Sequence, residues 1–419
     1  MSNYYIWTIG CQMNQAESER LGSLVQQMGY QPTATAEEAD LIVLNSCVVR
    51  QSAENRVINK LSALKPLKKS RPALTLAVTG CLVDSDLQEL RHRFPHVDYF
   101  FKPGDHPQWL EKTGLSPVLP RQPSPSTFVP IIQGCDNLCS YCIVPYRRGR
   151  ERSRLVDGIV SDVKELVANG VKEVILLGQN VDSYGHDLPG KPDLADLLYE
   201  LNAIDGLDRI RFLTNHPKDI SDRLIGAIAS LNKVCEQMNL PVQSGDNEIL
   251  RAMRRGYTVE QYRELVHRIR SRIAGMALST DVIVGFPSES EGQFWATVNL
   301  LRELRFDNVH VAVYSPRPGT IAAGEYEDNI PPAVKKERLA IIERLQQEIA
   351  TGINARLSGK TVEVLVEGKK KGKWHGRSRS GKLVFFTNQD DLLGQLVKIK
   401  IEKTSPWSLQ GKVISEQHQ

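Results

Sequence analysis

Three segments at the start of the chain share one pattern, in which an apolar stretch is followed by mixed polar and apolar residues with helical spacing. The apolar stretches predict β-strands that end at Cys11, Cys47 and Cys81, and the predicted helices that follow are QAESERLGSLVQQMG, SAENRVINKLSALK and SDLQELRHRF. A repeat of about 35 residues is the length of a strand–helix unit in a parallel sheet. Ligands of open parallel sheets bind at the carboxyl ends of the strands, so we expect the three cysteines to converge on one edge. Three unrelated core cysteines are the alternative.

A segment rich in proline and serine, GLSPVLPRQPSPSTF, predicts a linker that closes the first domain near residue 120. Beyond it, six apolar stretches alternate with helical patterns: FVPIIQG, VKEVILLGQN, IRFLTNHP, CEQMNLPVQSG, LSTDVIVGFP and NVHVAVYSPRPG. Six strand–helix units favour a barrel or partial barrel, in which sites lie at the carboxyl ends of the strands. The residues expected to line that end are Gly178, Gln179, Asn215, Gln243, Ser244, Gly285 and Tyr314.

The tail changes character after a long helical pattern, PPAVKKERLAIIERLQQEIATGINARLSG. Four short alternating stretches, TVEVLVEG, KLVFFT, LVKIKIEK and GKVISE, predict a small antiparallel β-barrel. The turn region KKKGKWHGRSRSGK gathers seven Lys or Arg residues and no acid around Trp374 and His375, a mixture suited to phosphate contacts and base stacking. A solvated hairpin is the alternative. The predicted domains are therefore residues 1–119, 120–351 and 352–417.

The composition, 41% hydrophobic and 24% charged residues, is that of a soluble globular protein. No apolar run approaches the roughly 18 residues that span a bilayer, and the first residues carry no secretion signal, so we expect a cytoplasmic protein without a membrane partner. A net charge of +4 is too small to identify a partner by itself. Seven cysteines in such a chain argue against a disulfide framework and for metal ligation or catalysis.

The most specific motif is FVPIIQGCDNLCSYCIVPY, in which Cys135, Cys139 and Cys142 follow the first barrel strand with C-x3-C-x2-C spacing. Structural zinc sites usually take four protein ligands, and no fourth cysteine or histidine is nearby in the sequence. Cysteine thiolates also hold iron–sulfur clusters, and three of them leave one iron open to an external ligand, so we favour a cluster over zinc. The seventh cysteine, Cys235, is predicted to be a buried core thiol within a strand.

This C-x3-C-x2-C loop after the first strand of a partial barrel resembles the radical S-adenosylmethionine superfamily. In that superfamily the open iron binds the amino and carboxylate groups of S-adenosylmethionine, and an electron from the cluster cleaves the cofactor to a deoxyadenosyl radical. The resemblance implies that Tyr141 contacts the adenine of the cofactor. Gly178 and Gln179, in LLGQN, stand where many of these enzymes have a Gly-Gly-Glu turn, and Gln243 and Ser244 are further candidates for binding the cofactor.

The order of a cysteine-bearing domain, a barrel and a small basic β-barrel is similar to that of the methylthiotransferases, over essentially the whole chain. Their successive motifs resemble GCQMN, NSCVVRQSAENR, SYCIVPYRRGRERSR, LLGQNVDSYG, IRFLTNHPKD, LPVQSG and STDVIVGFPSE followed by YSPRPGT. The most similar branch is the tRNA 2-methylthio-N(6)-dimethylallyladenosine synthases, and the tail resembles their TRAM domain. The resemblance implies two 4Fe-4S clusters, the second held by Cys11, Cys47 and Cys81. GCLVDSD, after the third of these cysteines, departs from the GCMAQ common in the family.

The implied reaction inserts sulfur and transfers a methyl group at carbon 2 of N(6)-dimethylallyladenosine at position 37 of tRNA, next to the anticodon. One cluster would supply the sulfur that one S-adenosylmethionine methylates. The radical from another S-adenosylmethionine would remove hydrogen from the substrate, so no catalytic side chain beyond the cluster ligands is expected. The implied partners are tRNA, a flavodoxin-like or equivalent electron donor and a sulfur source. The candidate tRNA-binding residues are Arg147, Arg148, Arg150, Lys371, Lys373, Trp374, Arg377 and Arg379, with Arg152 and Arg154 in the same basic run.

Three alternatives stay open from the sequence. A related branch modifies threonylcarbamoyl-adenosine in tRNA, and another methylthiolates an aspartate of a ribosomal protein. A zinc-containing RNA-binding protein without enzymatic activity is the third.

Overall fold

The computed structural model describes residues 1–48, 51–83, 87–103, 105 and 123–414. The chain forms two compact units. Unit 1 comprises Met1–Gln122, Gln133–Asn137 and Cys142–Glu151, and unit 2 comprises Pro123–Ile132, Leu138–Tyr141 and Arg152–Gln419. The predicted linker at 114–128 lies partly outside the described residues, and its last residues begin a strand of unit 2.

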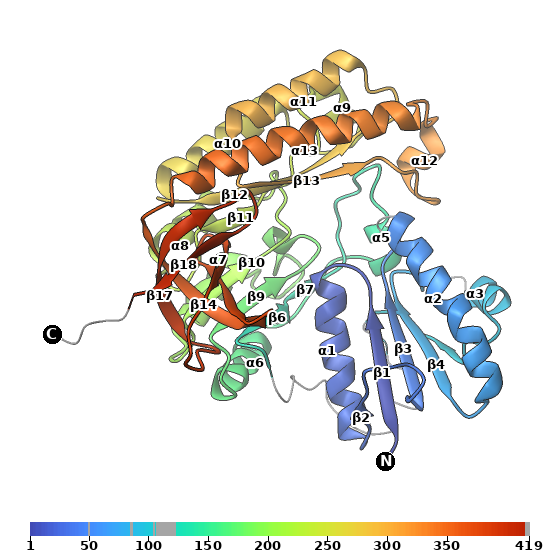
Figure 1. Ribbon diagram of the computed structural model, residues 1–419. Helices are drawn as coiled ribbons and strands as arrows, with labels where there is room; N and C mark the ends of the chain where they lie inside the picture. Colours follow the sequence, from blue (N-terminus) through green and yellow to red (C-terminus); the bar gives the residue numbers. More distant parts are fainter. Residues whose placement is uncertain (49–50, 84–86, 104, 106–122, 415–419) are drawn as a thin grey trace. The chain divides into compact units, whose positions relative to one another are not determined.

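Unit 1 is a parallel β-sheet with the strand order β2-β1-β3-β4-β5. The three predicted strands are confirmed, and a two-residue strand flanks them on each side (Figure 1). The strands are β1 (Asn3–Thr8), β2 (Gln31–Pro32), β3 (Leu41–Ser46), β4 (Thr75–Gly80) and β5 (Tyr99–Phe100). The helices are α1 (Gln12–Gln27), α2 (Gln51–Ser70), α3 (Leu87–Arg93) and, after the cysteine loop, α5 (Val144–Arg148).

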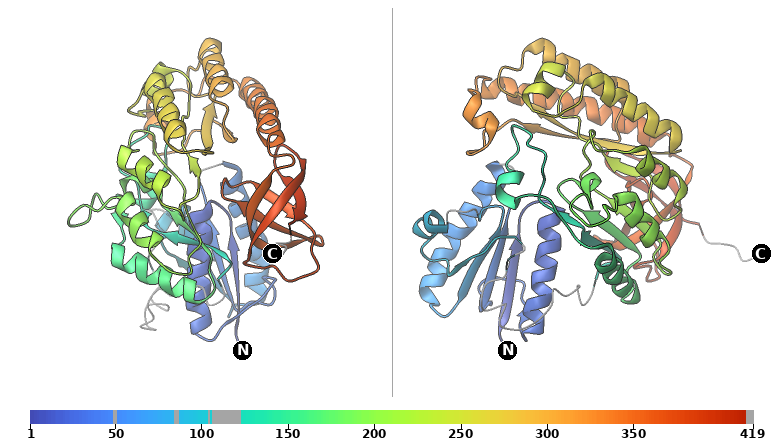
Figure 2. Two further views of the ribbon diagram at one scale, coloured as in Figure 1. Left: turned by 90° about the vertical axis from the view of Figure 1, so that its left-hand side faces the viewer. Right: turned by 180° about the vertical axis from the view of Figure 1, so that it is seen from behind.

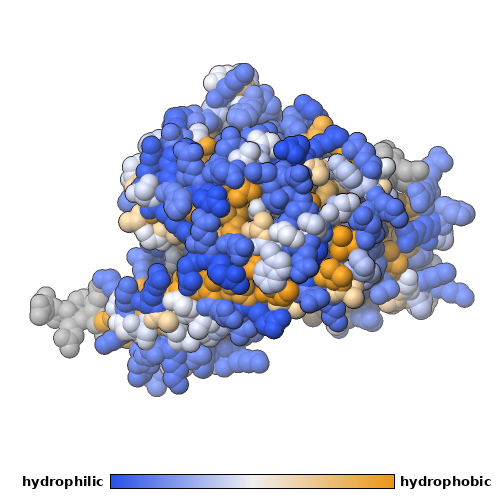
Figure 3. Space-filling view, turned by 90° about the horizontal axis from the view of Figure 1, so that it is seen from above, coloured by the Kyte–Doolittle hydropathy of each residue, from blue (hydrophilic) through white to orange (hydrophobic). Residues whose placement is uncertain are grey.

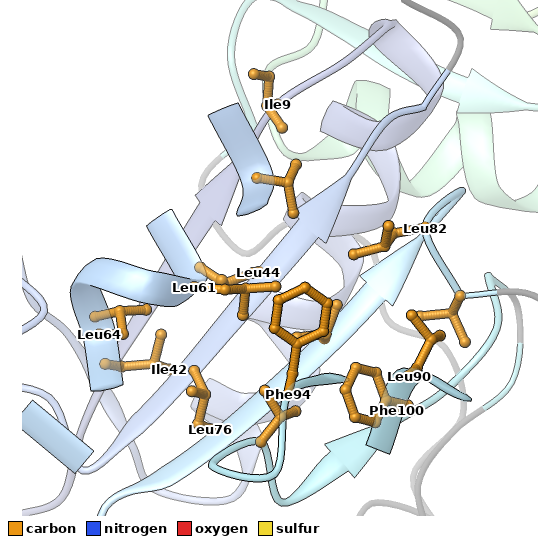
Figure 4. Close-up of a cluster of buried hydrophobic side chains, with 14 of the residues drawn as sticks. Ile9, Ile42, Leu44, Leu61, Leu64, Leu76, Leu82, Leu90, Phe94 and Phe100 are labelled. Atoms are coloured by element: carbon orange, nitrogen blue, oxygen red, sulfur yellow. The ribbon is translucent and has the colours of Figure 1, made fainter. Parts of the chain in front are cut away.

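Alternate residues of β3 point to opposite sides of the sheet, so both faces carry apolar side chains. Helices cover both faces. Leu41 and Val43 pack with Leu24 of α1, whereas Ile42 and Leu44 join the second cluster, to which α2 contributes (Figure 4). All six residues of β3 are buried, as expected for a parallel strand that is enclosed on both sides. The carboxyl ends of β1, β3 and β4 therefore emerge side by side at one edge of the sheet.

Unit 2 begins with six parallel strands separated by helices, which confirms the predicted partial barrel. The strands form two three-stranded sheets, β10-β9-β6 and β11-β12-β13 (Figure 2). An isolated bridge between Ile210 and Val234 leads from the first sheet toward the second. The strands are β6 (Ser126–Pro130), β9 (Glu173–Leu177), β10 (Arg209–Phe212), β11 (Gln237–Asn239), β12 (Ala277–Val284) and β13 (Asn308–Val313). Two short strands, β7 (Ile132–Gln133) and β8 (Arg152–Ser153), flank the cysteine loop.

The helices of the barrel carry strong start signals. Asp193, Ser221, Thr258 and Ser290 each cap a helix with their side chain, and three of these form a capping box. The helices are α6 (Val156–Ala168), η1 (Val181–Ser183), α7 (Leu194–Asn202), α8 (Asp222–Ser230), α9 (Asn247–Ala252), α10 (Val259–Arg272), α11 (Glu291–Leu304), α12 (Ile321–Glu325) and α13 (Pro332–Ala355).

The tail is a closed barrel of five strands in the order β14-β15-β16-β18-β17. The strands are β14 (Thr361–Lys370), β15 (Lys373–Ser378), β16 (Leu383–Phe386), β17 (Leu396–Thr404) and β18 (Leu409–Val413). All neighbours are antiparallel except β16 and β18, which are parallel. The region predicted as a turn, KKKGKWHGRSRSGK, is instead the end of β14, a turn and all of β15. Its basic residues conceal a strand because every second side chain, including Trp374, points inward.

The small barrel is fixed to the partial barrel of the same unit by buried arginines of β10. Arg209 donates a hydrogen bond of 2.8 Å to the carbonyl of Arg377, and Arg211 donates one of 2.7 Å to the carbonyl of Ser378. Arg211 also forms a 2.8 Å ion pair with the buried Glu173. The tail therefore belongs to the same compact unit as the barrel strands.

Hydrophilic residues cover most of the face in Figure 3, with hydrophobic residues in small patches among them. Within the described residues, the structure contains no helix that is both long and apolar enough to cross a membrane.

Candidate functional site

Cys11, Cys47 and Cys81 follow the adjacent strands β1, β3 and β4, as the sequence predicted. Cys11 is exposed at the start of α1, whereas Cys47 and Cys81 are only 6% and 4% exposed. The Cys81 amide donates a 2.7 Å hydrogen bond to the carbonyl of Ser46, which holds two of the cysteine-bearing turns together. Cys11 is close enough to Cys81 for their charges to interact.

Two glycines permit these turns to approach each other. A Cβ atom on Gly10 would lie 2.7 Å from the Cβ of Cys47, and one on Gly80 would lie 2.2 Å from the carbonyl oxygen of Ser46. Both glycines also have positive φ angles, +142° and +91°, which side chains rarely adopt. The glycine that precedes Cys11 and the one that precedes Cys81 are therefore requirements of the site.

Two buried asparagines brace the same edge of the sheet. Asn14 donates to the side chain of Asn45 at 2.8 Å and to the carbonyl of Ser46 at 2.9 Å. Its side-chain oxygen lies 3.2 Å from the Cys11 sulfur. Asn45 in return donates to the Asn14 carbonyl and to Ser18. These bonds fix the start of α1, and with it Cys11, against the end of β3.

Arg148 corrects one of the predicted tRNA contacts. Its side chain is buried within unit 1, where it forms a 2.6 Å ion pair with Glu17 and faces Cys81. Burial alone would lower the pKa of Arg148, but Cys81 and Glu17 raise that pKa above its ordinary value. Burial likewise raises the pKa of the Cys81 thiol, an effect that Arg148 opposes. A guanidinium enclosed in this way is not available to RNA phosphates. The sequence showed only a basic run and gave no signal that this one arginine turns inward.

The donor set fits iron–sulfur clusters. Within the described residues all seven cysteines are thiols rather than halves of disulfides. Also within those residues, no three His, Cys, Asp or Glu side chains form a ready site for a single metal ion. The thiolates of a four-iron cluster bind separate iron atoms, so they do not need to meet around one point. Three cysteines at a braced sheet edge, with a cation beside them, fit such a cluster.

The second set, Cys135, Cys139 and Cys142, lies within eight residues of chain. The Cys135 amide donates a 3.2 Å hydrogen bond to the carbonyl of Gly149. Gly134, just before it, has a φ of +83°, and a Cβ there would lie 2.1 Å from the carbonyl oxygen of Arg150. In unit 2, Cys139 is buried and the neighbouring Ser140 donates from its amide to Met253 and from its hydroxyl to Ala252. Backbone contacts thus hold Cys135 within unit 1 and Ser140 within unit 2.

Arg255 contacts this second set, which the sequence did not predict. Its side chain donates a 3.3 Å hydrogen bond to the Cys139 sulfur and lies 3.5 Å from the Tyr141 hydroxyl. Tyr141 itself is half-buried and packs against the cluster formed by Met253 and Phe286. The only sequence signal was a second basic pair, MRRGYT, of ordinary appearance.

The residues predicted to bind the cofactor lie at the carboxyl ends of the barrel strands. Gly178 is buried, and a Cβ on it would lie 2.4 Å from Ile132. Gln179, the next residue, is half-buried. Gln243 has a positive φ of 72° and a buried side-chain oxygen that has no hydrogen-bond partner among the described residues, as a ligand-binding group would. The Ser244 hydroxyl instead lies 3.4 Å from Thr297 and accepts from the amide of Asp246, so it braces the turn.

The predicted residue Asn215 belongs to a polar network beside these strands. Asp182, after β9, accepts hydrogen bonds of 2.6 Å from Asn215 and 2.7 Å from the His216 amide. Burial raises the pKa of Asp182 to about 7 and lowers the pKa of His216 to about 2, with Arg255 adding to the second effect. His216 is therefore neutral. Its Nδ1 accepts from the amide of Lys218, which places the proton on the buried Nε2, and this atom has no partner in the part of the chain that the structure describes.

The predicted RNA contacts divide into exposed and enclosed residues. Lys371, Lys373 and Arg377 are exposed on the hairpin of β14 and β15, and Arg150 is exposed although it pairs with Asp136 at 2.9 Å. Trp374 is only 7% exposed and belongs to the core of the small barrel, so base stacking on its ring, as predicted, is contradicted. Arg379 is also corrected, because it pairs with Glu236 at 2.7 Å and donates to the carbonyl of Val234.

The remaining predicted residues lie in the barrel or close to the cysteine loop. Arg147 is half-buried, Arg152 is exposed, and Arg154 pairs with Asp162 at 2.6 Å. Cys235 is buried as predicted, but it lies between the bridge residue Val234 and β11 rather than within a strand. Gly285 and Tyr314 follow β12 and β13. Both contact Lys335 of α13, since a Cβ on Gly285 would lie 2.4 Å from this lysine and Tyr314 accepts a hydrogen bond from it.

Comparison with known families and proteins gives consistent results along the chain. Residues 3–102 match an uncharacterized protein family, UPF0004, residues 129–301 match the radical SAM superfamily, and residues 355–414 match the TRAM domain. Among solved structures, the radical S-adenosylmethionine methyltransferase TsrM from Kitasatospora setae has a TM-score of 0.56 at 13% identity, over 90% of this chain and 81% of that one. The cobalamin-dependent S-adenosylmethionine radical enzyme OxsB has a TM-score of 0.52 at 12% identity, over 83% and 56%. These two likenesses concern the fold alone.

Curated relatives cover the chain from end to end. A tRNA-2-methylthio-N(6)-dimethylallyladenosine synthase from Dehalococcoides mccartyi is 56% identical over 99% of both chains. A protein of the same name from Chloroflexus aurantiacus is 49% identical over 97% of this chain and 91% of its own. Identity of this extent, through both cysteine sets and the TRAM barrel, shows that the chain belongs to the family of tRNA-2-methylthio-N(6)-dimethylallyladenosine synthases.

Proposed function

We propose that this protein is a radical S-adenosylmethionine methylthiotransferase that places a methylthio group on carbon 2 of N(6)-dimethylallyladenosine in tRNA, at position 37 next to the anticodon. The single observation that carries the proposal is the presence of two separate cysteine triads, each beside a buried arginine, in one chain that also has a TRAM barrel. The full-length relatives that bear this name support the substrate.

Two 4Fe-4S clusters and S-adenosylmethionine would supply the radical and sulfur chemistry that side chains cannot perform at an unactivated aromatic carbon. Cys135, Cys139 and Cys142 would hold the cluster that binds S-adenosylmethionine. Cys11, Cys47 and Cys81 would hold the second cluster, which serves sulfur transfer.

The protein's own residues bind and orient. Tyr141 and Gln179 are the candidates for contacts to S-adenosylmethionine. The buried oxygen of Gln243 and the Nε2 proton of His216 add an acceptor and a donor at the carboxyl ends of the strands. Ser244 no longer fits the cofactor, because its hydroxyl is engaged within the turn.

The substrate adenine is expected to enter from a single-stranded loop. Bases of RNA loops are read when they are splayed out of their stack, which costs little in a loop that is already unpaired. Lys371, Lys373 and Arg377 are exposed on the hairpin of the TRAM barrel, which supports a role in contacting phosphates. With Trp374 in the core, the hairpin would act through charge rather than through stacking.

The partners are tRNA, an electron donor of flavodoxin-like or equivalent type, and a source of sulfur. The reaction needs all three, because the clusters must be reduced and the transferred sulfur must be replaced. We place the reaction in the cytoplasm, where its tRNA substrate is found.

The test incubates the reduced, reconstituted protein with S-adenosylmethionine, a sulfide source and tRNA that either carries or lacks the dimethylallyl group, and then analyses the nucleosides by mass. We expect a methylthio product only from the dimethylallyl tRNA. Methylthiolation of threonylcarbamoyl-adenosine, or only of a ribosomal protein, would overturn the substrate assignment.

Iron content tests the two sites separately. We expect about eight irons per chain, as two four-iron clusters require, and about four in a Cys47→Ala variant. Colourless protein that binds zinc would support the non-enzymatic alternative. If the protein binds the iron of only one cluster, and Cys47→Ala does not change that amount, the site at Cys11, Cys47 and Cys81 would be contradicted.

A further inference from the structure

Arg255 is a buried cation whose hydrogen-bonding nitrogens are all engaged around the C-x3-C-x2-C loop. Nη1 donates to the Cys139 sulfur at 3.3 Å, Nε donates to the Tyr257 hydroxyl at 3.0 Å, and Nη2 donates to the Pro241 carbonyl at 3.0 Å. The residue is 4% exposed. Water therefore contributes little to the solvation of this charge.

The guanidinium of Arg255 has no carboxylate partner among the described residues. Three other buried arginines are compensated by carboxylates: Arg148 pairs with Glu17, Arg211 with Glu173, and Arg338 with Glu289. An unpaired buried charge is strongly destabilising, so a fold that keeps one needs an anion at that place. Nearby groups that can supply negative charge are the Cys139 sulfur and the hydroxyls of Tyr141 and Tyr257.

The backbone turn that carries Arg255 aims the side chain inward. Helix α9 ends with the amide of Arg254 bonded to the carbonyl of Arg251 and the amide of Arg255 bonded to the carbonyl of Leu250. This pair of bonds is a Schellman motif, and Arg254 has the required left-handed conformation, with a φ of +57°. The position that Arg255 occupies in this motif commonly carries an apolar residue that packs against the helix. Here an arginine takes that inward place.

The same turn holds the cysteine loop. Ser140, next to Cys139, donates its amide to Met253 at 3.0 Å and its hydroxyl to Ala252 at 2.7 Å. Loop and turn are thus joined by two hydrogen bonds besides that of Arg255. The contact between the guanidinium and the sulfur is therefore fixed by the backbone on both sides.

We propose that Arg255 is a positioning residue that raises the reduction potential of the cluster bound by Cys139. The cluster accepts one electron from an external one-electron donor and becomes more negative. A nearby positive charge and an N–H···S hydrogen bond stabilise the reduced form more than the oxidised form. The inference rests on the proposed function only for the presence of a cluster at Cys139.

The experiment is a redox titration of the full-length, reconstituted protein. The titration is monitored by the electron paramagnetic resonance signal that changes when S-adenosylmethionine is added. In Arg255→Gln, the ratio of reduced to oxidised cluster at a fixed potential should fall about tenfold, which is about 59 mV for one electron. Arg255→Lys keeps the charge but loses the fork of donors, so its ratio should fall by roughly threefold. The matched control is Arg254→Gln, which removes the same charge from an exposed residue paired with Glu325 and should leave the titration unchanged.

Every outcome decides the question. The proposal would be overturned if an Arg255 variant that holds the cluster had the reduction potential of the wild type. An equal shift of the potential in Arg254→Gln would overturn it as well. Loss of the cluster in both Arg255 variants would assign the residue a purely structural role and would also overturn it. No tRNA is present in this experiment. A failed nucleoside assay with shifted potentials would therefore contradict the substrate alone.

Discussion

The two cysteine sites are built in opposite ways. Cys135, Cys139 and Cys142 lie within eight residues, so their grouping follows from the sequence spacing. Cys11, Cys47 and Cys81 are brought to one sheet edge by three parallel strands and by close contacts at Gly10 and Gly80. The grouping of Cys135, Cys139 and Cys142 is thus local in sequence, whereas the grouping of Cys11, Cys47 and Cys81 depends on the folding of the whole sheet.

The buried arginines of the two sites also differ. Arg148 beside Cys81 is compensated by Glu17, whereas Arg255 beside Cys139 has no carboxylate partner among the described residues. A net positive surrounding favours reduction of a cluster, and a compensated one favours it less. Under the proposed function, the more easily reduced cluster would therefore be the one at Cys139, which would take up the electron used to cleave S-adenosylmethionine.

The largest effect is expected for Cys139→Ala. The variant should lose about four of about eight irons and all cleavage of S-adenosylmethionine, because three thiolates are needed to hold that cluster. Deoxyadenosine measured by mass, together with bound iron, checks this. Cys235→Ala is the matched control, since it removes a thiol that is also buried but lies in neither triad. Full iron in Cys139→Ala would refute the assignment.

Arg148→Met should be the next largest effect and concerns stability. It leaves Glu17 partly buried without its partner, and breaking such a pair costs about 3 kcal/mol. Urea unfolding of the protein without iron measures this free energy directly. Arg150→Met, at an exposed arginine two residues further on, should change it by less than about 0.5 kcal/mol. Equal values for the two variants would mean that the Arg148 pair is not a stabilising element.

The smallest effect is expected for Glu17→Gln and concerns the reduction potential of the N-terminal cluster. It tests whether the compensated charge of Arg148 and the uncompensated charge of Arg255 act differently. Removal of the carboxylate leaves Arg148 uncompensated, as Arg255 is, so the N-terminal cluster should become easier to reduce. We expect its reduced-to-oxidised ratio at fixed potential to rise roughly threefold, about 30 mV for one electron. A redox titration of the signal that does not respond to S-adenosylmethionine checks this. A shift in the opposite direction would mean that compensation by Glu17 does not set the potential.

Much of the fold could be predicted from hydrophobic patterning. The three strands of unit 1 and the six of the barrel were each marked by an apolar run bounded by polar or glycine residues. Strand β15 was missed because its basic residues alternate with Trp374 and Gly376, and a strand with one charged face reads as a turn when lysines and glycines surround it. The parallel pairing of β16 with β18 was also missed, since strand order in a closed barrel depends on contacts distant in sequence.

The assignment of the cysteines as cluster ligands stays a prediction from the sequence, and their charged neighbours were not predicted. Arg148 and Arg150 are alike in the sequence, yet one is buried beside Cys81 and the other is exposed. Arg255 lies 116 residues from Cys139 along the chain, and nothing in MRRGYT marks which arginine turns inward. Such roles depend on tertiary contacts, and only the structure reveals them.

The division of labour between the two sites is tested most directly in Cys47→Ala, incubated with reductant, S-adenosylmethionine, a sulfide source and dimethylallyl tRNA. Deoxyadenosine and 2-methylthio nucleoside are measured by mass in the same sample. We predict that deoxyadenosine still forms while the methylthio nucleoside is absent. Methylthio nucleoside at the wild-type level would contradict the account, because it would show that the N-terminal site is not needed for sulfur transfer.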